Sequence, residues 1–186
     1  MRAIFMGNPE FALPTLKALL SSRHDVVAVV SNPPKPIGRG RKLRSTAVGQ
    51  FAKENNLNFI ETESLKSAEL HDQLSALKPD VFVVVAYRIL PKSLIDLPKY
   101  GAVNLHASLL PKYRGAGPIQ WSLMNGDKTT GVTVFQINPW VDRGEILLQK
   151  EMDIFPDDDM LSLGMRLCNA GANLIVDALD RLENGT

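Results

Sequence analysis

Short apolar runs, separated by polar segments rich in glycine and proline, set the pattern of this chain. The clearest runs are residues 3–6, within a predicted strand at residues 2–6, residues 26–30, and residues 81–86, which read Val-Phe-Val-Val-Val-Ala. Unbroken runs of this kind are typical of strands that are covered on both faces of a parallel sheet, so we expect residues 81–86 near its centre. The pattern predicts further strands at residues 58–60, 131–137 and 146–154.

Helical spacing of apolar residues occurs between these strands. It predicts helices over residues 14–22, 68–77, 118–124 and 160–183, and another that begins at a Ser45 or Thr46 cap and includes Ala52. Three consecutive aspartates before residue 160 favour the start of the last helix because they complement its dipole. The alternation of strands and helices indicates an α/β, doubly wound fold with a mostly parallel sheet in a single domain.

Residues 101–115 contain a strand followed by a polar loop. Period-two alternation at the start places Asn104 and His106 on the same side of the strand. Pro111 cannot donate to a ladder and Gly115 allows a tight turn, so the chain then leaves the sheet. Ligands of open parallel sheets bind outside the carboxyl ends of the strands, where Asn104 and His106 would lie. On this segment alone, a core histidine held by an asparagine is an equally good interpretation.

Length and composition limit the kind of protein. A chain of 186 residues suits one domain with a substantial core. The single cysteine, Cys168, excludes a disulfide framework and is typical of a cytoplasmic protein, and we expect it to be a small buried hydrophobe. The first apolar run is too short for a signal peptide, and no run approaches the length of a membrane span. A soluble protein is therefore expected.

Positive charge is concentrated in one short segment. The net charge is only +1, yet no acidic residue occurs between Asp25 and Glu54. Without the five cations of this segment, the rest of the chain would carry a net charge of −4. The five are Lys35, Arg39, Arg41, Lys42 and Arg44. The prolines and glycines of residues 31–44 predict a mobile surface loop, and its charge predicts an anionic partner, with a solvated charge run as the alternative.

Several common ligand sites are not indicated. The loop after the first strand has one glycine, whereas a dinucleotide-binding fingerprint needs three, and it lacks the lysine of a phosphate-binding loop. This argues against NAD and ATP. His24, His71 and His106 lie far apart without metal-ligand spacing, so no metal site is predicted, and we expect His24 and His71 on the surface.

The segment at residues 104–115 reads Asn-Leu-His-Ala-Ser-Leu-Leu-Pro-Lys-Tyr-Arg-Gly and, with Asp142 downstream, closely resembles the folate-dependent formyltransferases. Further motifs occur in the matching order at residues 6–12, 38–43, 117–121 and 125–127. The resemblance covers the whole chain, and within the family it is strongest to members that act on methionine attached to tRNA. It implies a Rossmann-like catalytic domain.

This resemblance implies that the formyl group of the co-substrate 10-formyltetrahydrofolate is transferred to the α-amino group of initiator methionyl-tRNA. It implies a catalytic trio of Asn104, His106 and Asp142, without a metal. The implied folate site comprises Tyr87, Arg88, Ile89, Leu90, Ser108, Leu109, Leu110, Pro111, Pro139, Trp140 and Val141. The implied tRNA contacts are Lys35, Arg39, Arg41, Lys42 and Arg44. A monomeric cytoplasmic enzyme without membrane contact is expected.

The chemistry of formyl transfer explains why these residue types suit the reaction. Transfer between two nitrogens passes through a tetrahedral species whose oxygen carries negative charge. The Asn104 amide and a ring N–H of His106 can donate to that oxygen, and His106 can carry protons from the attacking amine to the departing nitrogen. Asp142 would orient the imidazole and favour its charged form, although a turn aspartate is more commonly structural.

The sequence also departs from the family pattern. Relatives continue into a β-barrel domain that helps to hold tRNA, whereas we expect residues 1–186 to form only the catalytic domain, with a basic insertion at about residues 32–45. The turn at residues 86–91 is one residue shorter than usual, which bears on folate affinity. Aromatic residues that could line a pocket, although packing is their commoner role, are Phe11, Trp121 and Trp140.

Two rival functions remain open. Another folate-dependent enzyme, acting on a sugar nucleotide, on glycinamide ribonucleotide or as a formyltetrahydrofolate hydrolase, would use the same trio, but it does not need so long a basic loop. A non-catalytic tRNA- or folate-binding fragment is the second alternative. The presence of Asn104, His106 and Asp142 together argues against it.

Overall fold

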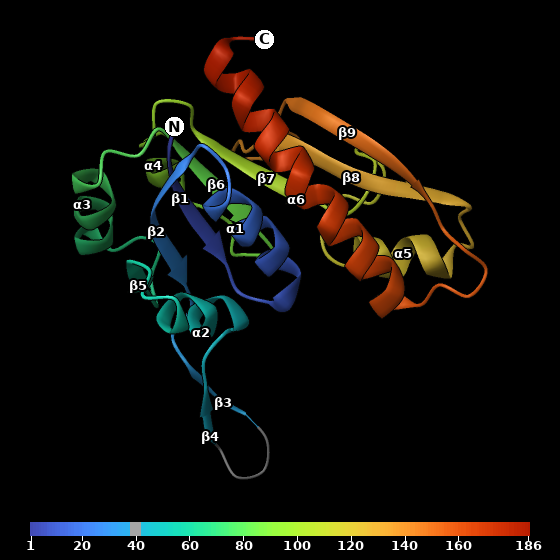
Figure 1. Cartoon of the computed structure of the whole chain (residues 1–186), viewed down its shortest axis with the longest axis horizontal. Coiled ribbons are helices and arrows are strands. Elements are labelled where there is room, and N and C mark those ends of the chain that lie inside the picture. Colours follow the sequence, from blue (N-terminus) through green and yellow to red (C-terminus); the bar gives the residue numbers. More distant parts are fainter. Residues whose placement is uncertain (38–41) are drawn as a thin grey trace.

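A seven-stranded sheet forms the middle layer of the molecule (Figure 1). The computed structural model describes residues 1–37 and 42–186. The strands follow the order β5-β2-β1-β6-β7-β8-β9, in which the first five are parallel and β8 and β9 are antiparallel to their neighbours. Their bounds are Arg2–Gly7 (β1), Asp25–Ser31 (β2), Phe59–Glu61 (β5), Val81–Val85 (β6), Ala102–His106 (β7), Thr129–Gln136 (β8) and Ile146–Asp153 (β9). The mostly parallel sheet with β6 at its centre is confirmed.

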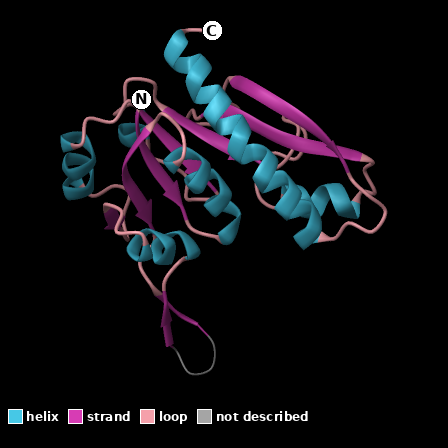
Figure 2. Cartoon of the chain, viewed as in Figure 1, coloured by secondary structure: helices cyan, strands magenta, loops and turns pink. Residues whose placement is uncertain are grey.

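Helices cover both faces of the sheet (Figure 2). Their bounds are Glu10–Ala12 (η1, a 3-10 turn), Leu13–Leu20 (α1), Ala47–Glu54 (α2), Ala68–Ala76 (α3), Lys92–Ile95 (α4), Pro118–Met124 (α5) and Met160–Asn184 (α6). On one face, α1, α2, α5 and α6 pack against alternate strand residues, such as Ala3 and Phe5 of β1. On the other, α3 and α4 pack against the intervening residues, such as Ile4 and Met6. Burial on both faces explains the unbroken apolar runs and confirms the doubly wound fold.

The long helix α6 fixes the strand that carries the predicted site. Asp159 caps it by accepting hydrogen bonds from the backbone N–H groups of Leu161 and Ser162, as the aspartate run predicts. Figure 1 shows α6 lying diagonally across the sheet. At Gly171 an added Cβ would stand 2.4 Å from Leu105 of β7, so only glycine allows this close packing. Among the helices of residues 1–37 and 42–186, none has the length and apolar character that crossing a membrane would require.

The basic segment differs from the predicted loop. Lys35–Ile37 (β3) and Lys42–Arg44 (β4) form an antiparallel two-stranded ladder that projects from the body of the molecule (Figure 1). Pro36 is paired with Leu43 in this ladder, and a small ladder with open edges tolerates the missing N–H of proline. Two of the predicted tRNA contacts, Arg39 and Arg41, lie outside the described residues.

Candidate active site

The carboxyl ends of β6 and β7 lie side by side. The parallel register pairs Val84 with Asn104 and Val85 with Leu105. The chain leaves β6 just before Tyr87 and leaves β7 at His106, so the two predicted segments reach the same edge of the sheet. This is the edge at which open α/β sheets bind their ligands.

His106 is held between a backbone carbonyl and a carboxylate. It is 7% exposed. Its Nε2 lies 2.8 Å from the carbonyl oxygen of Tyr113, and its Nδ1 lies 3.6 Å from Oδ2 of Asp142. Because a carbonyl oxygen can only accept, this hydrogen bond places a proton on Nε2. In the neutral imidazole Nδ1 therefore carries the lone pair, and a proton taken up there would face Asp142.

Asp142 belongs to the loop between β8 and β9, which folds back toward the end of β7. Its Oδ2 accepts a hydrogen bond from the backbone N–H of Gly115 at 2.7 Å, and its carbonyl accepts one from Nε of Arg114 at 2.9 Å. Its φ of 48° lies in the left-handed region, which aspartate tolerates better than most residues. The loop after β7 thus holds the carboxylate beside His106.

Asn104 lies two residues before His106 on β7 and is half-buried. Period two places both side chains on the same face of the strand. Within residues 1–37 and 42–186 the Asn104 side-chain amide has no hydrogen-bond partner. Its N–H₂ group is therefore available to a ligand oxygen.

A buried hydroxyl network holds the loop that follows His106. Oγ1 of Thr133 donates to the carbonyl of Ser108 at 2.6 Å and accepts from the backbone N–H of Leu110 at 3.1 Å. Nε2 of Gln149 donates to the same hydroxyl and to the Leu110 carbonyl, both at 2.9 Å. Ser108 and Leu110 are buried, so of the four predicted folate residues in this loop only Leu109 and Pro111 offer side chains to solvent.

The predicted folate residues after β6 border a groove. Arg88, Ile89 and Leu90 line a cavity of about 360 Å³ together with Pro91 and residues 63–66. The Arg88 guanidinium donates to the carbonyls of Thr62 and Glu63 and to the Tyr87 hydroxyl, which ties this loop to the end of β5. Burial raises the pKa of Tyr87, which stays neutral.

The remaining predicted ligand residues lie on the surface. Pro139, Trp140 and Val141 are exposed, and Trp140 is 71% exposed. The three hairpin cations that the structure describes, Lys35, Lys42 and Arg44, are exposed as well. Of the other aromatic residues, Trp121 is exposed and Phe11 packs against the core. A second cavity, of about 430 Å³ between residues 95–102 and 136–137, contains none of the predicted residues.

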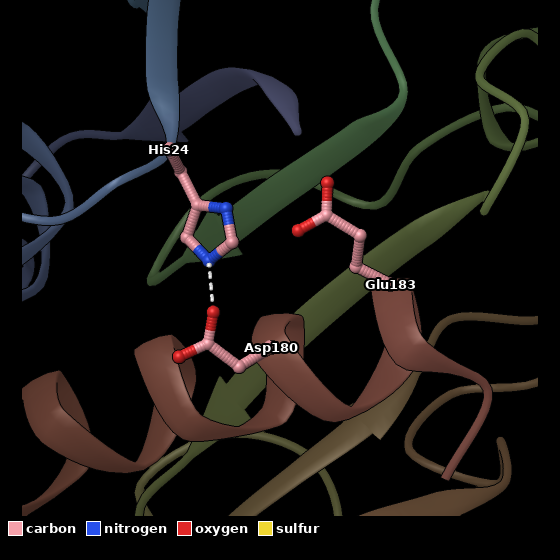
Figure 3. A group of neighbouring side chains, drawn as sticks. All are labelled: His24, Asp180 and Glu183. Carbon is pink, nitrogen blue, oxygen red and sulfur yellow. Dashed lines mark ion pairs between the residues drawn. The ribbon is translucent and has the colours of Figure 1, made fainter.

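A second histidine and two carboxylates meet at the opposite edge of the sheet (Figure 3). His24 is 5% exposed, so the predicted surface position was wrong. Its Nε2 lies 3.2 Å from Oδ1 of Asp180, and its Nδ1 lies 3.2 Å from the Met1 amino group. In the described part of the chain, His24, Asp180 and Glu183 form the only three-residue group with metal-like spacing, within 4.8 Å.

Fixed cations already balance this second cluster. The Met1 ammonium lies 3.1 Å from Glu183, and Arg23 contacts Asp180 at 2.6 Å and Glu183 at 2.7 Å. Burial first, and then the nearby ammonium, lower the pKa of His24, so the ring is neutral. The ammonium also lowers the pKa of Glu183. A metal ion would have to displace two cations, so the cluster ties α6 to the strands and does not resemble a vacant metal site.

A family model and several curated proteins match most or all of this chain. Residues 1–179 match the family model described as "Formyl transferase". The methionyl-tRNA formyltransferase of Thermodesulfovibrio yellowstonii is 46% identical over 183 residues, which cover 98% of this chain and 59% of that protein. The methionyl-tRNA formyltransferase of Acidobacterium capsulatum is 47% identical over 188 residues, covering 100% and 60%. The chain thus spans about 60% of the length of these curated relatives.

Solved structures show the same fold at lower identity. Glycinamide ribonucleotide transformylase 1 from Symbiobacterium toebii has a TM-score of 0.81 and 20% identity, covering 100% of this chain and 88% of its own. A formyltetrahydrofolate deformylase from Pseudomonas syringae pv. tomato has a TM-score of 0.79 and 20% identity, covering 98% and 61%. These similarities show that the chain shares a Rossmann-like fold with both structures.

Proposed function

The chain belongs to the formyl transferase family, and from this premise we propose that it transfers the formyl group of 10-formyltetrahydrofolate to the α-amino group of initiator methionyl-tRNA. The observation that carries the proposal is the group formed at the carboxyl edge of the sheet. There an unpaired amide, Asn104, shares a strand face with His106, whose Nδ1 faces the Asp142 carboxylate. Relatives that share 46% and 47% identity and carry the name methionyl-tRNA formyltransferase support this choice of acceptor.

Each side chain has a role that its geometry allows. The attacking amine forms a bond to the formyl carbon and passes a proton to Nδ1 of His106, which carries the lone pair in the neutral ring. The Asn104 amide donates to the oxyanion of the tetrahedral species. The Nδ1 proton then passes to the donor nitrogen of the folate as its bond to the formyl carbon breaks. Asp142, 3.6 Å from Nδ1, stabilises the imidazolium that exists between these two proton transfers.

The folate would lie in the space between the loop after β6 and the loop that carries Asp142. The exposed residues Ile89 and Trp140 offer apolar surface to its rings, and Arg88 keeps the first loop in place through the backbone of residues 62–63. Ser108 and Leu110 would shape the loop and not contact the folate, because their side chains are buried and their backbone groups bond to Thr133 and Gln149. No metal is needed for any step in this scheme.

A direct assay decides between this function and its rivals. The chain is incubated with 10-formyltetrahydrofolate and, in separate reactions, with methionyl-tRNA, with a nucleotide amino-sugar, with glycinamide ribonucleotide or with water alone. We expect formyl-methionyl-tRNA as the product. Another formylated acceptor or free formate would replace the proposed acceptor, and a lack of any product would leave a binding fragment. Size measurement by light scattering would test the monomeric state that we also propose.

The β3–β4 hairpin provides a test of the tRNA partner. Replacement of Lys35, Lys42 and Arg44 by alanine removes three exposed cations. We expect KM for methionyl-tRNA to rise about tenfold or more at moderate salt, and the salt dependence of binding to weaken by roughly 0.9 in log–log slope for each lost phosphate contact. KM for the folate should not change, because none of these three cations belongs to the proposed folate site.

A matched control keeps the same change in net charge. Lys128, Lys150 and Arg181 are also exposed, and their replacement by alanine should leave tRNA binding and its salt dependence unaltered. Equal effects of both triple variants would show that the total charge matters and that the hairpin does not recognise the tRNA.

A further inference from the structure

Tyr113 connects the His106 ring to the turn at residues 125–127, which contains none of the proposed catalytic or ligand-binding residues. Its carbonyl oxygen accepts a hydrogen bond from Nε2 of His106 at 2.8 Å, and its hydroxyl donates to Oδ2 of Asp127 at 2.7 Å. Nδ2 of Asn125 donates to the same hydroxyl at 2.8 Å. One residue therefore fixes the imidazole with its backbone and is itself fixed through its phenol.

The backbone of Tyr113 requires such an anchor. Its φ of 56° lies in the left-handed region, where a bulky residue is strained. Residues in such conformations persist only when the surrounding contacts hold them there. Without the bond from its hydroxyl, the peptide after Tyr113 could relax, and its carbonyl would no longer point at Nε2.

Asp127 is suited to this anchoring role. Nζ of Lys112 lies 2.8 Å from the same carboxylate oxygen and 5.0 Å from the centre of the Tyr113 ring. The hydrogen bonds from Lys112 and then from Tyr113 lower the pKa of Asp127, so its carboxylate stays charged at neutral pH. A charged acceptor makes the bond from the phenol stronger than a neutral one would.

The rest of the loop is held by other contacts. The network around Thr133 fixes residues 108–110, and the Ser108 hydroxyl donates to the carbonyl of Lys112 at 2.6 Å. These contacts end one residue before Tyr113. On the other side, Arg114 and Gly115 bond to Asp142. Tyr113 lies between these two held groups, and its own side chain is fixed by the bonds from its phenol to the turn at residues 125–127.

We propose that Tyr113 and Asp127 are positioning residues for formyl transfer, an inference that rests on the proposed function. Their bond keeps the Tyr113 carbonyl against Nε2 and so keeps the neutral ring in the Nε2–H form, with Nδ1 free to take the proton of the amine. If the anchor is lost, Asp142 draws the proton to Nδ1, because an N–H that donates to a carboxylate makes the stronger bond. That form cannot accept the proton of the attacking amine at Nδ1.

The test combines kinetics with ¹⁵N NMR of the imidazoles. Tyr113→Phe removes only the hydroxyl, and Asp127→Ala removes its acceptor. In the full chain each should lower kcat about fivefold to tenfold, the size expected for one lost hydrogen bond, with little change in KM for the folate. The double variant should be no slower than either single one, because both changes break the same link.

The spectra report on the ring itself. Histidine-labelled protein should show neutral His106 as the Nε2–H form in the wild type and a mixture with the Nδ1–H form in both variants. Signals are assigned with variants of the other two histidines. Tyr100→Phe is the matched control, because it makes the same chemical change away from the site and should alter neither kcat nor the His106 signals.

The outcomes separate the two proposals. If the wild type forms no formyl-methionyl-tRNA, the proposed function fails, whereas the tautomer can still be read by NMR. If the wild type is active and Tyr113→Phe keeps both its kcat and the His106 signals, the positioning role is refuted. A lower kcat with unchanged His106 signals in a variant of wild-type melting temperature refutes it too, because the effect would not pass through His106.

Discussion

Two buried histidine–carboxylate pairs lie at opposite ends of the strands of one sheet. His24 lies at the amino end of β2, 3.2 Å from Asp180, and His106 lies at the carboxyl end of β7, 3.6 Å from Asp142. The two residues are almost equally buried, at 5% and 7% exposure. Judged by distance and burial, the His24 pair is the tighter of the two. Those measures alone would select the His24 pair and not the proposed site.

The pairs differ in what they leave available to a ligand. Nδ1 of His24 faces the Met1 ammonium, and its buried Nε2 lies 3.2 Å from Asp180 without forming a hydrogen bond. Arg23 and the Met1 ammonium balance the carboxylates around it. At the other edge, no lysine, arginine or terminal ammonium in the described part of the chain forms an ion pair with Asp142, and the neighbouring Asn104 amide is unpaired. A polar cluster whose charges are balanced stabilises the fold. A cluster with an unpaired hydrogen-bond donor and a carboxylate that lacks a cationic partner can act on a substrate.

The largest expected effect is a difference in activity between variants of the two histidines. His106→Ala should lower kcat/KM for formyl transfer by about 10²–10⁴, the usual contribution of a positioned acid–base group. His24→Gln should keep the wild-type rate, because His24 lies before the amino end of β2 and the proposed site lies at the carboxyl ends of the strands. Steady-state assays of both variants at one pH provide the measurement. Equal losses in both would show that burial of a histidine–carboxylate pair, and not its open partners, governs activity.

The next effect concerns the open amide. Asn104→Ala removes the donor to the oxyanion and should lower kcat by about 10²–10³, as measured for comparable donors in other acyl transfers. Asn173→Ala on the exposed side of α6 makes the same change without a role in the site. The loss should lie in kcat rather than in KM, because the oxyanion exists only in the transition state. A change in KM alone would assign Asn104 to ground-state binding.

The sequence predicted the main strands and helices better than the short elements between them. Apolar runs identified β1, β2 and β6 because burial on both faces keeps the central positions of these strands apolar. Helix caps at Thr46 and Asp159 marked the starts of α2 and α6. The short α4 was not predicted, because one turn gives too few residues for a periodic signal. The β3–β4 ladder was missed because proline marks loops, while strand pairing depends on register.

At the candidate site too, features that follow from local geometry were predicted, and contacts that depend on tertiary packing were missed. Period two placed Asn104 and His106 on one face, since that follows from strand geometry alone. The Tyr113 carbonyl as partner of Nε2 was missed, because a positive φ at a tyrosine cannot be read from composition. The burial of His24 was also missed. It results from Asp180 and Glu183, more than 150 positions away in the chain, which only the packing of α6 brings near.

The smallest expected effect is a pH dependence of the free energy of unfolding that comes from His24. The folded protein holds His24 with a pKa below its ordinary value of 6.5, so between these two values the unfolded chain binds more protons. The free energy of unfolding should therefore fall as the pH decreases below 6.5, by at most about 1.4 kcal/mol per pH unit for this single proton. His24→Gln should remove that slope at every pH in this interval.

The carboxylates with lowered pKa, such as Asp158 and Asp159, lose their contribution to stability only at lower pH, so they do not affect the slope in this interval. Urea unfolding of wild type and variant across this interval measures the slope, and parallel curves would mean that His24 accepts its proton as readily in the fold as outside it.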